Sequence, residues 1–280
     1  MSADAPGQPT LQCPCDEQHF ERLHCYEARP DGEVQFDLGA AEYRRELRRC
    51  GLCRHVISVH DMDMTQLYEG EYVDATYGAD GLRRSFERIV GLPPGASDNV
   101  GRAARIVEFA REFLGEHGDA PRLLDVGSGL AVFPHRMKSH GWQCVALDPD
   151  ERAAQHAREV AGVDAVCGDF MTVDVDALGT FDCITFNKVL EHVLDPIGML
   201  GRARPLLTDR GFAYIELPDG EAAWDEGPGR EEFFIDHHHV FSPSSLTFLA
   251  ERAGFRIVEL ERLREPSNKF TLRAFARGQT

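Results

Sequence analysis

The stretch most able to bind a reactive ligand is residues 122–132, RLLDVGSGLAV. It reads as a short apolar strand that ends at Asp125, followed by a turn through Gly127, Ser128 and Gly129 and then by a helix. Glycine adopts backbone conformations closed to other residues and lets a ligand lie directly against the main chain. A strand, a tight glycine turn and a helix together form a cofactor crevice at the carboxyl edge of a parallel sheet. A plain strand-to-helix turn would use the same glycines, because a lone glycine motif is weakly specific.

Acidic residues at the ends of the next strands indicate what the crevice holds. Asp148 ends the strand CVALD about 20 residues beyond the glycine turn, where a carboxylate meets ribose hydroxyls. Asp169 ends a third strand and stands beside Phe170, a pair suited to an adenine amine and ring face. With Asp125, these carboxylates would repel a pyrophosphate, so they favour a cationic nucleoside without phosphate.

Candidate catalytic groups follow the fourth strand, CITFN. Asn187, Glu191 and His192 lie there, beside the position expected for a reacting group. His192 can titrate near neutral pH and would suit a general base, although a histidine that packs against the cofactor loop is the alternative. His237, in the segment DHHH, is a second candidate for the base or for a substrate contact.

The three consecutive histidines 237–239 also raise the possibility of a catalytic metal, with Glu216 or Asp219 as a further ligand. Adjacent side chains on an extended chain point to opposite sides, so at most two of these histidines could share an ion. The metal interpretation of this segment is therefore the weaker one.

Cysteines near the N-terminus predict a structural zinc site. The proposed ligands are Cys13, Cys15, Cys50 and Cys53. The pair in CGLC has the two-residue gap of a zinc knuckle, and four thiolates leave no open position for catalysis. Cys25, His19 or His24 could replace Cys15 if the one-residue gap of CPC is too strained, and a set of free thiols is the alternative.

The elements that must position these groups follow from the pattern of the chain. From residue 121 onward, apolar strands alternate with helices, which predicts an α/β fold with a Rossmann-like, doubly wound, mostly parallel seven-stranded sheet. FRIVEL and FTLRAFAR are expected to close it as an antiparallel edge. We divide the chain into an N-terminal segment, 1–95, and a larger domain, 96–280. Tyr68, Tyr72 and Tyr77 either pack on that domain or form a lid over the site.

Composition limits the classes of partner and compartment. The formal net charge of −17 disfavours broad nucleic-acid binding, which needs clustered Lys and Arg. No apolar run approaches the length of a membrane span, and the first ten residues do not resemble a signal peptide. We therefore expect a cytoplasmic protein whose eight cysteines are reduced.

Taken together, these motifs resemble class I S-adenosylmethionine-dependent methyltransferases. The matching segments, in the order in which the family has them, are LLDVGSGLAVFPHRM, CVALDPD, VCGDF, FDCITFNKVLEHVLDP and GFAYIELPD. The resemblance implies that residues 125–129 lie against the methionine part of the cofactor. It further implies that Asp148 and Pro149 lie at the ribose, that Asp169 and Phe170 flank the adenine, and that Asn187 belongs to the same site. Ala131 replaces a third glycine found in many members.

The cysteine-bearing leader resembles zinc-ribbon segments of methyltransferases in sugar and natural-product pathways. This implies transfer of a methyl group to a small polar metabolite, and we expect a hydroxyl of a sugar or natural-product intermediate. C- or N-methylation, and a non-catalytic scaffold with a partner-binding zinc ribbon, are the alternatives. A nicotinamide dehydrogenase fits less well, because Val132 stands where G-x-G-x-x-G needs its third glycine. The sequence leaves the acceptor and the oligomeric state open.

Overall fold

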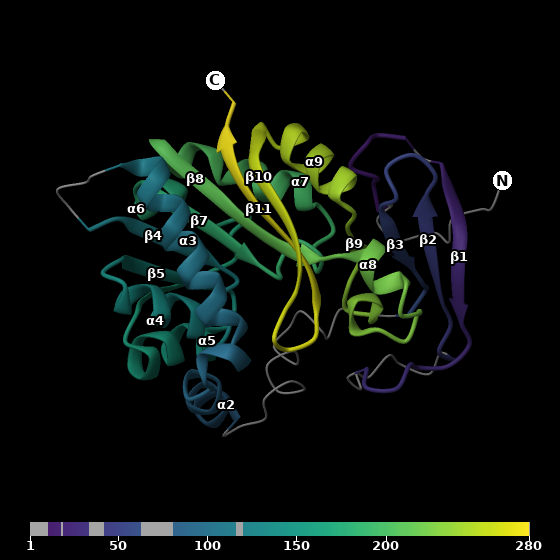
Figure 1. Ribbon diagram of the computed structural model, residues 1–280, viewed down its shortest axis with the longest axis horizontal. Coiled ribbons are helices and arrows are strands. Elements are labelled where there is room, and N and C mark those ends of the chain that lie inside the picture. Colours follow the sequence, from purple (N-terminus) through teal and green to yellow (C-terminus); the bar gives the residue numbers. More distant parts are fainter. Residues whose placement is uncertain (1–10, 18, 34–41, 63–80, 116–119, 280) are drawn as a thin grey trace.

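The main sheet has seven strands, in the order β10-β11-β8-β7-β4-β5-β6 (Figure 1). The computed structural model describes residues 11–17, 19–33, 42–62, 81–115 and 120–279. The strands are β4 (Arg122–Val126), β5 (Gln143–Asp148), β6 (Asp164–Cys167), β7 (Phe181–Asn187), β8 (Leu207–Pro218), β10 (Phe255–Arg264) and β11 (Phe270–Gly278). β4 to β8 pair in parallel, whereas β11 runs antiparallel to both of its neighbours. The predicted mostly parallel α/β sheet is confirmed.

The last two strands pair antiparallel, as predicted, but they do not follow one another outward at the edge. β11 inserts between β8 and β10, so the last strand of the chain lies inside the sheet. Its residues 271–276 are all buried, which accounts for the apolar character of FTLRAF.

Helices cover both faces of this sheet. They are α2 (Gly81–Val90), α3 (Asp98–Leu114), α4 (Val132–Ser139), α5 (Glu151–His156), α6 (Val175–Leu178), α7 (Pro196–Arg202), α8 (Gly220–Trp224) and α9 (Pro243–Arg252). Successive strand residues point to opposite faces. Leu123 and Cys183 accordingly pack with α3 and α4, while Leu124 and Ile184 pack with α7 and α9. The sheet is therefore doubly wound.

Local sequence signals explain where α9 begins. The Ser242 hydroxyl accepts a hydrogen bond from the Ser245 backbone N–H at 3.0 Å, and the Ser245 hydroxyl accepts one from the Ser242 N–H at 2.9 Å. This reciprocal pair is a capping box, and Pro243 supplies a first helical residue that needs no hydrogen-bond donor.

A second, four-stranded sheet lies beside the main one (Figure 1). It consists of β1 (Phe20–Tyr26), β2 (Arg45–Cys50), β3 (Val56–Val59) and β9 (His239–Val240), all paired antiparallel. β9 comes from the segment that follows β8 and α8, and it pairs with β3 at Val56–Val240 and Ile57–His239. The N-terminal sheet is thus completed by a strand from the larger part of the chain. The division at residue 95 stays a prediction.

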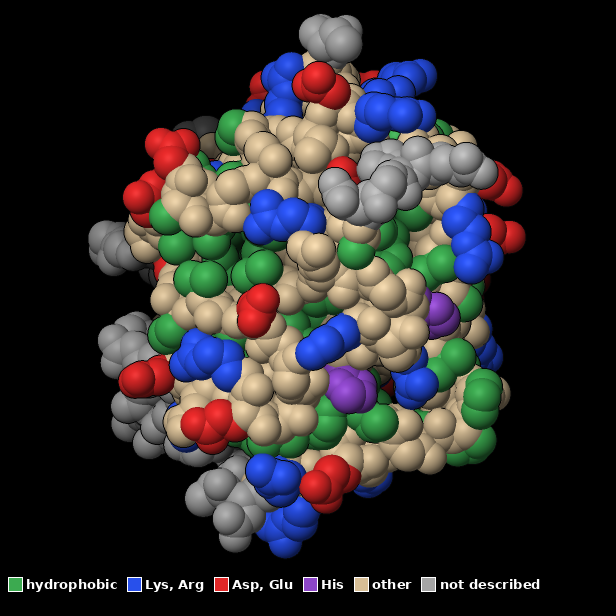
Figure 2. Space-filling view, turned by 90° about the vertical axis from the view of Figure 1, so that its left-hand side faces the viewer, with side chains coloured by type: hydrophobic (Ala, Val, Ile, Leu, Met, Phe, Trp, Pro, Cys, Tyr) green, Lys and Arg blue, Asp and Glu red, His purple; other side chains and the backbone are tan. Residues whose placement is uncertain are grey.

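Three further expectations concern the tyrosine segment, membrane-spanning helices and the distribution of surface charge. Tyr68, Tyr72 and Tyr77 lie outside the described residues. Within the described part of the chain, no helix combines the length and the apolar character needed to cross a membrane. On the face shown in Figure 2, Lys and Arg side chains lie singly or in small groups among Asp, Glu and uncharged side chains.

Candidate functional site

The glycine turn after β4 leaves open space above its backbone. Gly127 and Gly129 have φ angles of 67° and 49°, in the left-handed region that favours glycine. A Cβ on Gly127 would lie 2.7 Å from Val189 Cγ2, whereas a Cβ on Gly129 would meet nothing within 4 Å. The Gly127 and Ser128 N–H groups both donate to the Leu147 carbonyl, at 2.8 and 3.2 Å. The turn is therefore fixed to β5, and its open side at Gly129 can receive a ligand.

Asp148 is held across this turn. Its Oδ2 accepts a hydrogen bond from the Gly129 N–H at 2.8 Å, and its Oδ1 accepts one from the Asp150 N–H at 3.0 Å. The residue is 8% exposed, and burial raises the pKa of its carboxyl. Each carboxylate oxygen has a second lone pair, so both can accept a hydrogen bond from a ligand hydroxyl. Pro149 is exposed beside it.

Asp125 lies deeper and positions Asn187. The Asp125 Oδ1 accepts hydrogen bonds from the Thr185 hydroxyl at 2.6 Å and from Asn187 Nδ2 at 2.7 Å. Burial raises the pKa of Asp125 to about 6. The Asn187 Oδ1 is buried and has no hydrogen-bond partner within the described residues. Asp125 therefore fixes the orientation of the Asn187 amide, whose oxygen lacks a hydrogen-bond donor among the described residues.

The side chains of Asp169 and Phe170 lie in different environments, one exposed and the other buried. Asp169 is exposed, and its Oδ1 accepts a hydrogen bond from the Met171 N–H at 2.8 Å. Phe170 is 2% exposed and packs on Phe186, with ring centroids 5.8 Å apart. Its ring thus belongs to the core and offers little surface to a ligand. The adenine role of both residues stays a prediction.

Three of the candidate catalytic residues come together from two segments. Glu191 and His192 follow β7, and His237 follows a turn at residues 231–233. One ligand atom of each lies within 4.8 Å of the others. The His238 and His239 N–H groups donate to the Glu191 carbonyl, at 2.8 and 3.2 Å, and so tie the segments to each other. Sequence reasoning named all three residues but could not show that they meet.

The two imidazoles of this cluster are oriented by the backbone. His192 Nδ1 lies 2.8 Å from the Asp236 carbonyl oxygen, and His237 Nδ1 lies 2.8 Å from the Glu232 carbonyl oxygen. A carbonyl oxygen only accepts, so Nδ1 carries a proton in each ring, and in the neutral form of the ring Nε2 holds the lone pair. The rings are 4.8 Å apart, edge to face, and burial lowers the pKa of His237.

The consecutive histidines do not form a metal site with Glu216 or Asp219. The Glu216 carboxylate is buried against Arg102, whose Nε lies 2.8 Å from Oε2, and Asp219 is bound by Arg262 at 2.6 Å. His239 turns the other way, and its Nδ1 lies 3.0 Å from His55 Nε2. Residues 235–238 form a turn and a bend, and the strand begins only at His239, so His237 and His239 face different partners.

The four cysteines form one cluster. Cys13 Sγ lies 3.3 Å from Cys15 Sγ and 3.2 Å from Cys53 Sγ, and Cys15 Sγ lies 3.7 Å from Cys50 Sγ. Zn–S bonds of about 2.3 Å in a tetrahedron place sulfurs about 3.8 Å apart, so the donor set fits zinc. Cys25 donates instead to Glu27, at 3.2 Å. The described residues therefore group Cys15, rather than Cys25, His19 or His24, with the other three cysteines.

The N-terminal sheet holds the segment that carries His237. Arg45 is fully buried on β2, where Nη1 donates to the Phe233 carbonyl at 2.6 Å and Nη2 lies 3.3 Å from Glu33 Oε2. The same Glu33 oxygen accepts a hydrogen bond from the Ile235 N–H at 2.8 Å. Sequence analysis missed this pair, because the charges of RELRRC are typical of an exposed strand.

Lys188 is a second residue that sequence analysis missed. Its Nζ donates to the Thr271 hydroxyl at 2.8 Å, and burial lowers the pKa of its ammonium group. Its φ of 58° marks the sharp turn between β7 and Glu191. A single lysine between the strand and Glu191 follows no sequence pattern that predicts a buried hydrogen bond or a sharp turn.

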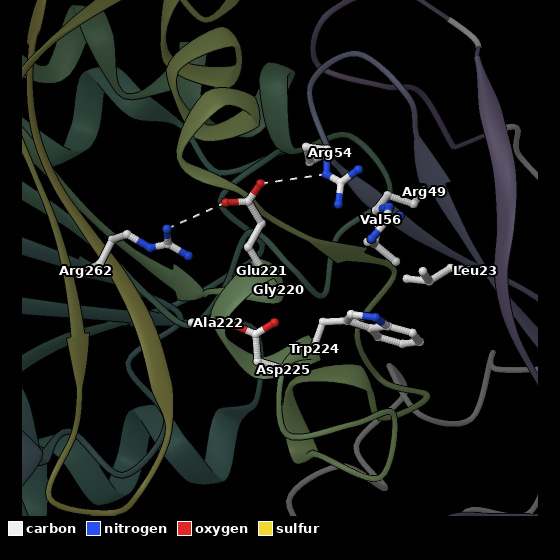
Figure 3. A pocket seen from close by; sticks show the side chains of 10 residues that line it. All are labelled: Leu23, Arg49, Arg54, Val56, Gly220, Glu221, Ala222, Trp224, Asp225 and Arg262. Carbon is white, nitrogen blue, oxygen red and sulfur yellow. Dashed lines mark ion pairs between the residues drawn. The ribbon is translucent and has the colours of Figure 1, made fainter.

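A cavity of about 430 Å³ lies where the N-terminal sheet faces α8 and β10 (Figure 3). Glu221 stands between Arg54 and Arg262, at 3.9 and 3.6 Å, while Trp224 forms part of the wall. Arg49 also lines the cavity, and burial together with nearby Arg54 lowers its pKa. The lining is charged and suits a polar ligand.

Comparisons with known proteins agree with this architecture. A family model described as a methyltransferase domain matches residues 99–260. A ubiquinone biosynthesis O-methyltransferase from Methylocella silvestris is 30% identical over 158 residues, which is 55% of each chain. A tRNA U34 carboxymethyltransferase from Dichelobacter nodosus is 30% identical over 152 residues, or 49% of this chain and 46% of that one. The chain thus spans about half the length of these curated relatives.

Solved structures share the fold. Magnesium protoporphyrin IX methyltransferase from Synechocystis, with bound SAH, has a TM-score of 0.54 at 14% identity and covers 78% of this chain and 100% of its own. A 1,6-didemethyltoxoflavin-N1-methyltransferase from Burkholderia thailandensis has a TM-score of 0.52 at 20% identity, with 81% and 96% covered. At these identities the similarity concerns the fold alone.

Proposed function

The chain belongs to the methyltransferase-domain family, and from this membership we propose that it transfers a methyl group from S-adenosylmethionine to a small polar metabolite. The resemblance found in the sequence is confirmed by the same match. We propose a hydroxyl of a sugar or natural-product intermediate as the acceptor.

The observation that carries this proposal is the cluster of Glu191, His192 and His237 beyond β7. Methyl transfer from a sulfonium is an in-line displacement, in which the protein mainly aligns the nucleophile, the methyl group and the leaving sulfur. A hydroxyl is a poor nucleophile until a base takes its proton. The Nε2 lone pairs of the two histidines can take that proton, and Glu191 can stabilise the positive charge that follows.

The cofactor part of the proposal rests on the edge formed by β4 and β5. The open side of Gly129 gives the cofactor room, and Asp148 is oriented to accept hydrogen bonds from ribose hydroxyls. Asn187 offers its unpaired Oδ1 to a polar group of the methionine part. Bound here, S-adenosylmethionine would supply an electrophilic methyl group.

The acceptor part of the proposal rests on the histidines beyond β7, which can take the proton of a hydroxyl. The lining of the charged cavity includes none of these residues, so the cavity does not define the acceptor. The formal net charge of −17 disfavours the clustered Lys and Arg that bind nucleic acid, so a small metabolite is favoured over RNA.

We propose zinc at the four cysteines, in a structural role. Ser242 donates a hydrogen bond to the Cys53 carbonyl at 2.5 Å, and Arg252 lies 3.3 Å from Asp16, so the cluster is attached to α9. Zinc would order this junction. We also propose a cytoplasmic location, where thiols stay reduced.

The proposal is tested by incubating the full chain with S-adenosylmethionine and a panel of hydroxyl, amine and carbon acceptors. Mass spectrometry should detect a product heavier by one methylene unit, and NMR should locate the new methyl on oxygen. Asp148→Asn serves as the control with weakened cofactor binding. Methylation only at nitrogen or carbon would overturn the hydroxyl assignment, and cofactor uptake without turnover on any acceptor would favour the scaffold alternative.

A further inference from the structure

We propose that Glu191, His192 and His237 form a second metal site, which binds a divalent transition-metal cation through one carboxylate oxygen and two imidazole nitrogens. The three ligand atoms lie within 4.8 Å of one another. Ligands at about 2.1 Å from a shared ion stand about 3.0 Å apart in an octahedron and about 3.4 Å apart in a tetrahedron, a difference that small side-chain rotations close. Neither the cysteine cluster nor the cofactor edge includes these residues.

The hydrogen bonds behind the histidines are the first support. A metal-bound histidine almost always donates its second ring N–H to a carbonyl or carboxylate, which fixes the tautomer and the ring orientation. His192 and His237 both do so, to the carbonyl oxygens of Asp236 and Glu232 at 2.8 Å. In the neutral form of each ring, Nε2 is therefore the nitrogen that can bind a metal.

The environment of Glu191 is the second support. Its side chain is 0% exposed, and neither carboxylate oxygen has a hydrogen-bond partner among the described residues. A buried carboxylate is costly unless a cation or hydrogen bonds compensate it. Lys188 on the same segment attracts the Glu191 carboxylate electrostatically, but its Nζ donates to Thr271, so it leaves both carboxylate oxygens without a hydrogen bond. A metal ion between Glu191 and the histidines would satisfy the charge.

The choice of metal follows from the donors. Two imidazoles and one carboxylate suit first-row divalent ions and leave coordination positions open. The cysteine cluster differs, because its four sulfur ligands leave no coordination position open on a zinc ion. Here the further claim rests on the proposed function: an acceptor hydroxyl bound at an open position would have a lower pKa and would release its proton to solvent water before methyl transfer. In the metal-bound protein His192 and His237 would be ligands, and water would take the proton in their place.

Mn²⁺ is the probe, because thiolates bind it poorly and its unbound form is counted by electron paramagnetic resonance. The full zinc-loaded chain is titrated with MnCl₂ in the absence of S-adenosylmethionine and acceptor. One saturable site is expected. His237→Gln and Glu191→Gln should each weaken it at least tenfold, whereas His140→Gln, at an exposed histidine after α4, should leave the affinity unchanged.

Circular dichroism of each variant shows that it is folded, and His237→Gln provides the test if Glu191→Gln is not. No saturable binding to the wild type, or binding that the folded variants retain unchanged, would overturn the proposal. Because the titration uses no cofactor or acceptor, its failure is distinct from a failure of methyl transfer.

Discussion

Replacing Asp125 with asparagine should stabilise the protein at neutral pH. The carboxylate is 2% exposed, and its Oδ1 accepts hydrogen bonds from Thr185 and Asn187. Asparagine has nearly the same shape, and its oxygen can accept the same two hydrogen bonds. What changes is the charge, because burial raises the pKa of Asp125 from 3.8 to about 6.

The size of the effect follows from that pKa. A carboxyl whose pKa is raised on folding contributes stability below its unfolded pKa, and this contribution is lost as the pH rises through the folded pKa. For Asp125 the shift from 3.8 to about 6 corresponds to about 3 kcal/mol. Asparagine stays neutral and keeps this contribution. The variant should therefore gain about 1.5 kcal/mol over wild type at about pH 5 and about 3 kcal/mol at about pH 8.

Urea unfolding of both proteins between pH 5 and 8, without cofactor, measures the gain. Thr185→Val is the matched control of opposite sign, because the Thr185 hydroxyl lowers the pKa of Asp125. Its loss of stability relative to wild type should grow with pH. A gain for Asp125→Asn that is constant across this range, or a loss at pH 8, would refute the assignment of a buried ionised carboxylate.

Asp148→Asn should raise the dissociation constant of S-adenosylmethionine at least about tenfold in calorimetry, because a hydrogen bond to a charged group contributes about 1.5–3 kcal/mol; an unchanged constant would contradict the ribose assignment. Cys53→Ser should lower both the bound zinc, measured by elemental analysis, and the melting temperature, while Cys25→Ser should alter neither; equal zinc in both would rule out the four-cysteine site. Arg45→Met should lower the unfolding free energy by about 3–5 kcal/mol, because it leaves Glu33 buried without its cation, and adding Glu33→Gln should recover part of this loss. A double variant no more stable than the single one would show that the charge of Glu33 is not the cause.

Periodicity and caps were enough to predict the main sheet. Most of the parallel strands contain a short apolar run, and the helix before the last two strands begins at a recognisable cap, Ser242. Since parallel strands end at one edge, the sequence also placed Asp125 and Asp148 together, and both lie at the ends of adjacent strands. These inferences need only local pattern and the rule of parallel connection.

What each acidic or aromatic side chain does at that edge could not be predicted. Asp125 and Asp148 look equivalent in sequence, yet one is held by Asn187 in the interior and the other by the Gly129 backbone. Phe170 turns into the core although its neighbour Asp169 is exposed. These differences depend on which residues of other strands lie opposite, and no local pattern carries that information.

The proximity of His237 to Glu191 depends on the N-terminal sheet, because the segment that carries His237 covers the apolar face of that sheet. Tyr26, Leu47 and Val56 of that sheet form one buried cluster with residues from the later segment, Phe233 and Val240 among them. The same segment runs through Asp236 and His237 between these two anchors. Any change that loosens the N-terminal sheet, loss of zinc included, should therefore displace His237 from Glu191 before it disturbs the cofactor edge. Cofactor affinity and methyl transfer should consequently respond differently to Cys53→Ser, which removes a zinc ligand and leaves Glu191, His192 and His237 intact: turnover should fall more than cofactor affinity.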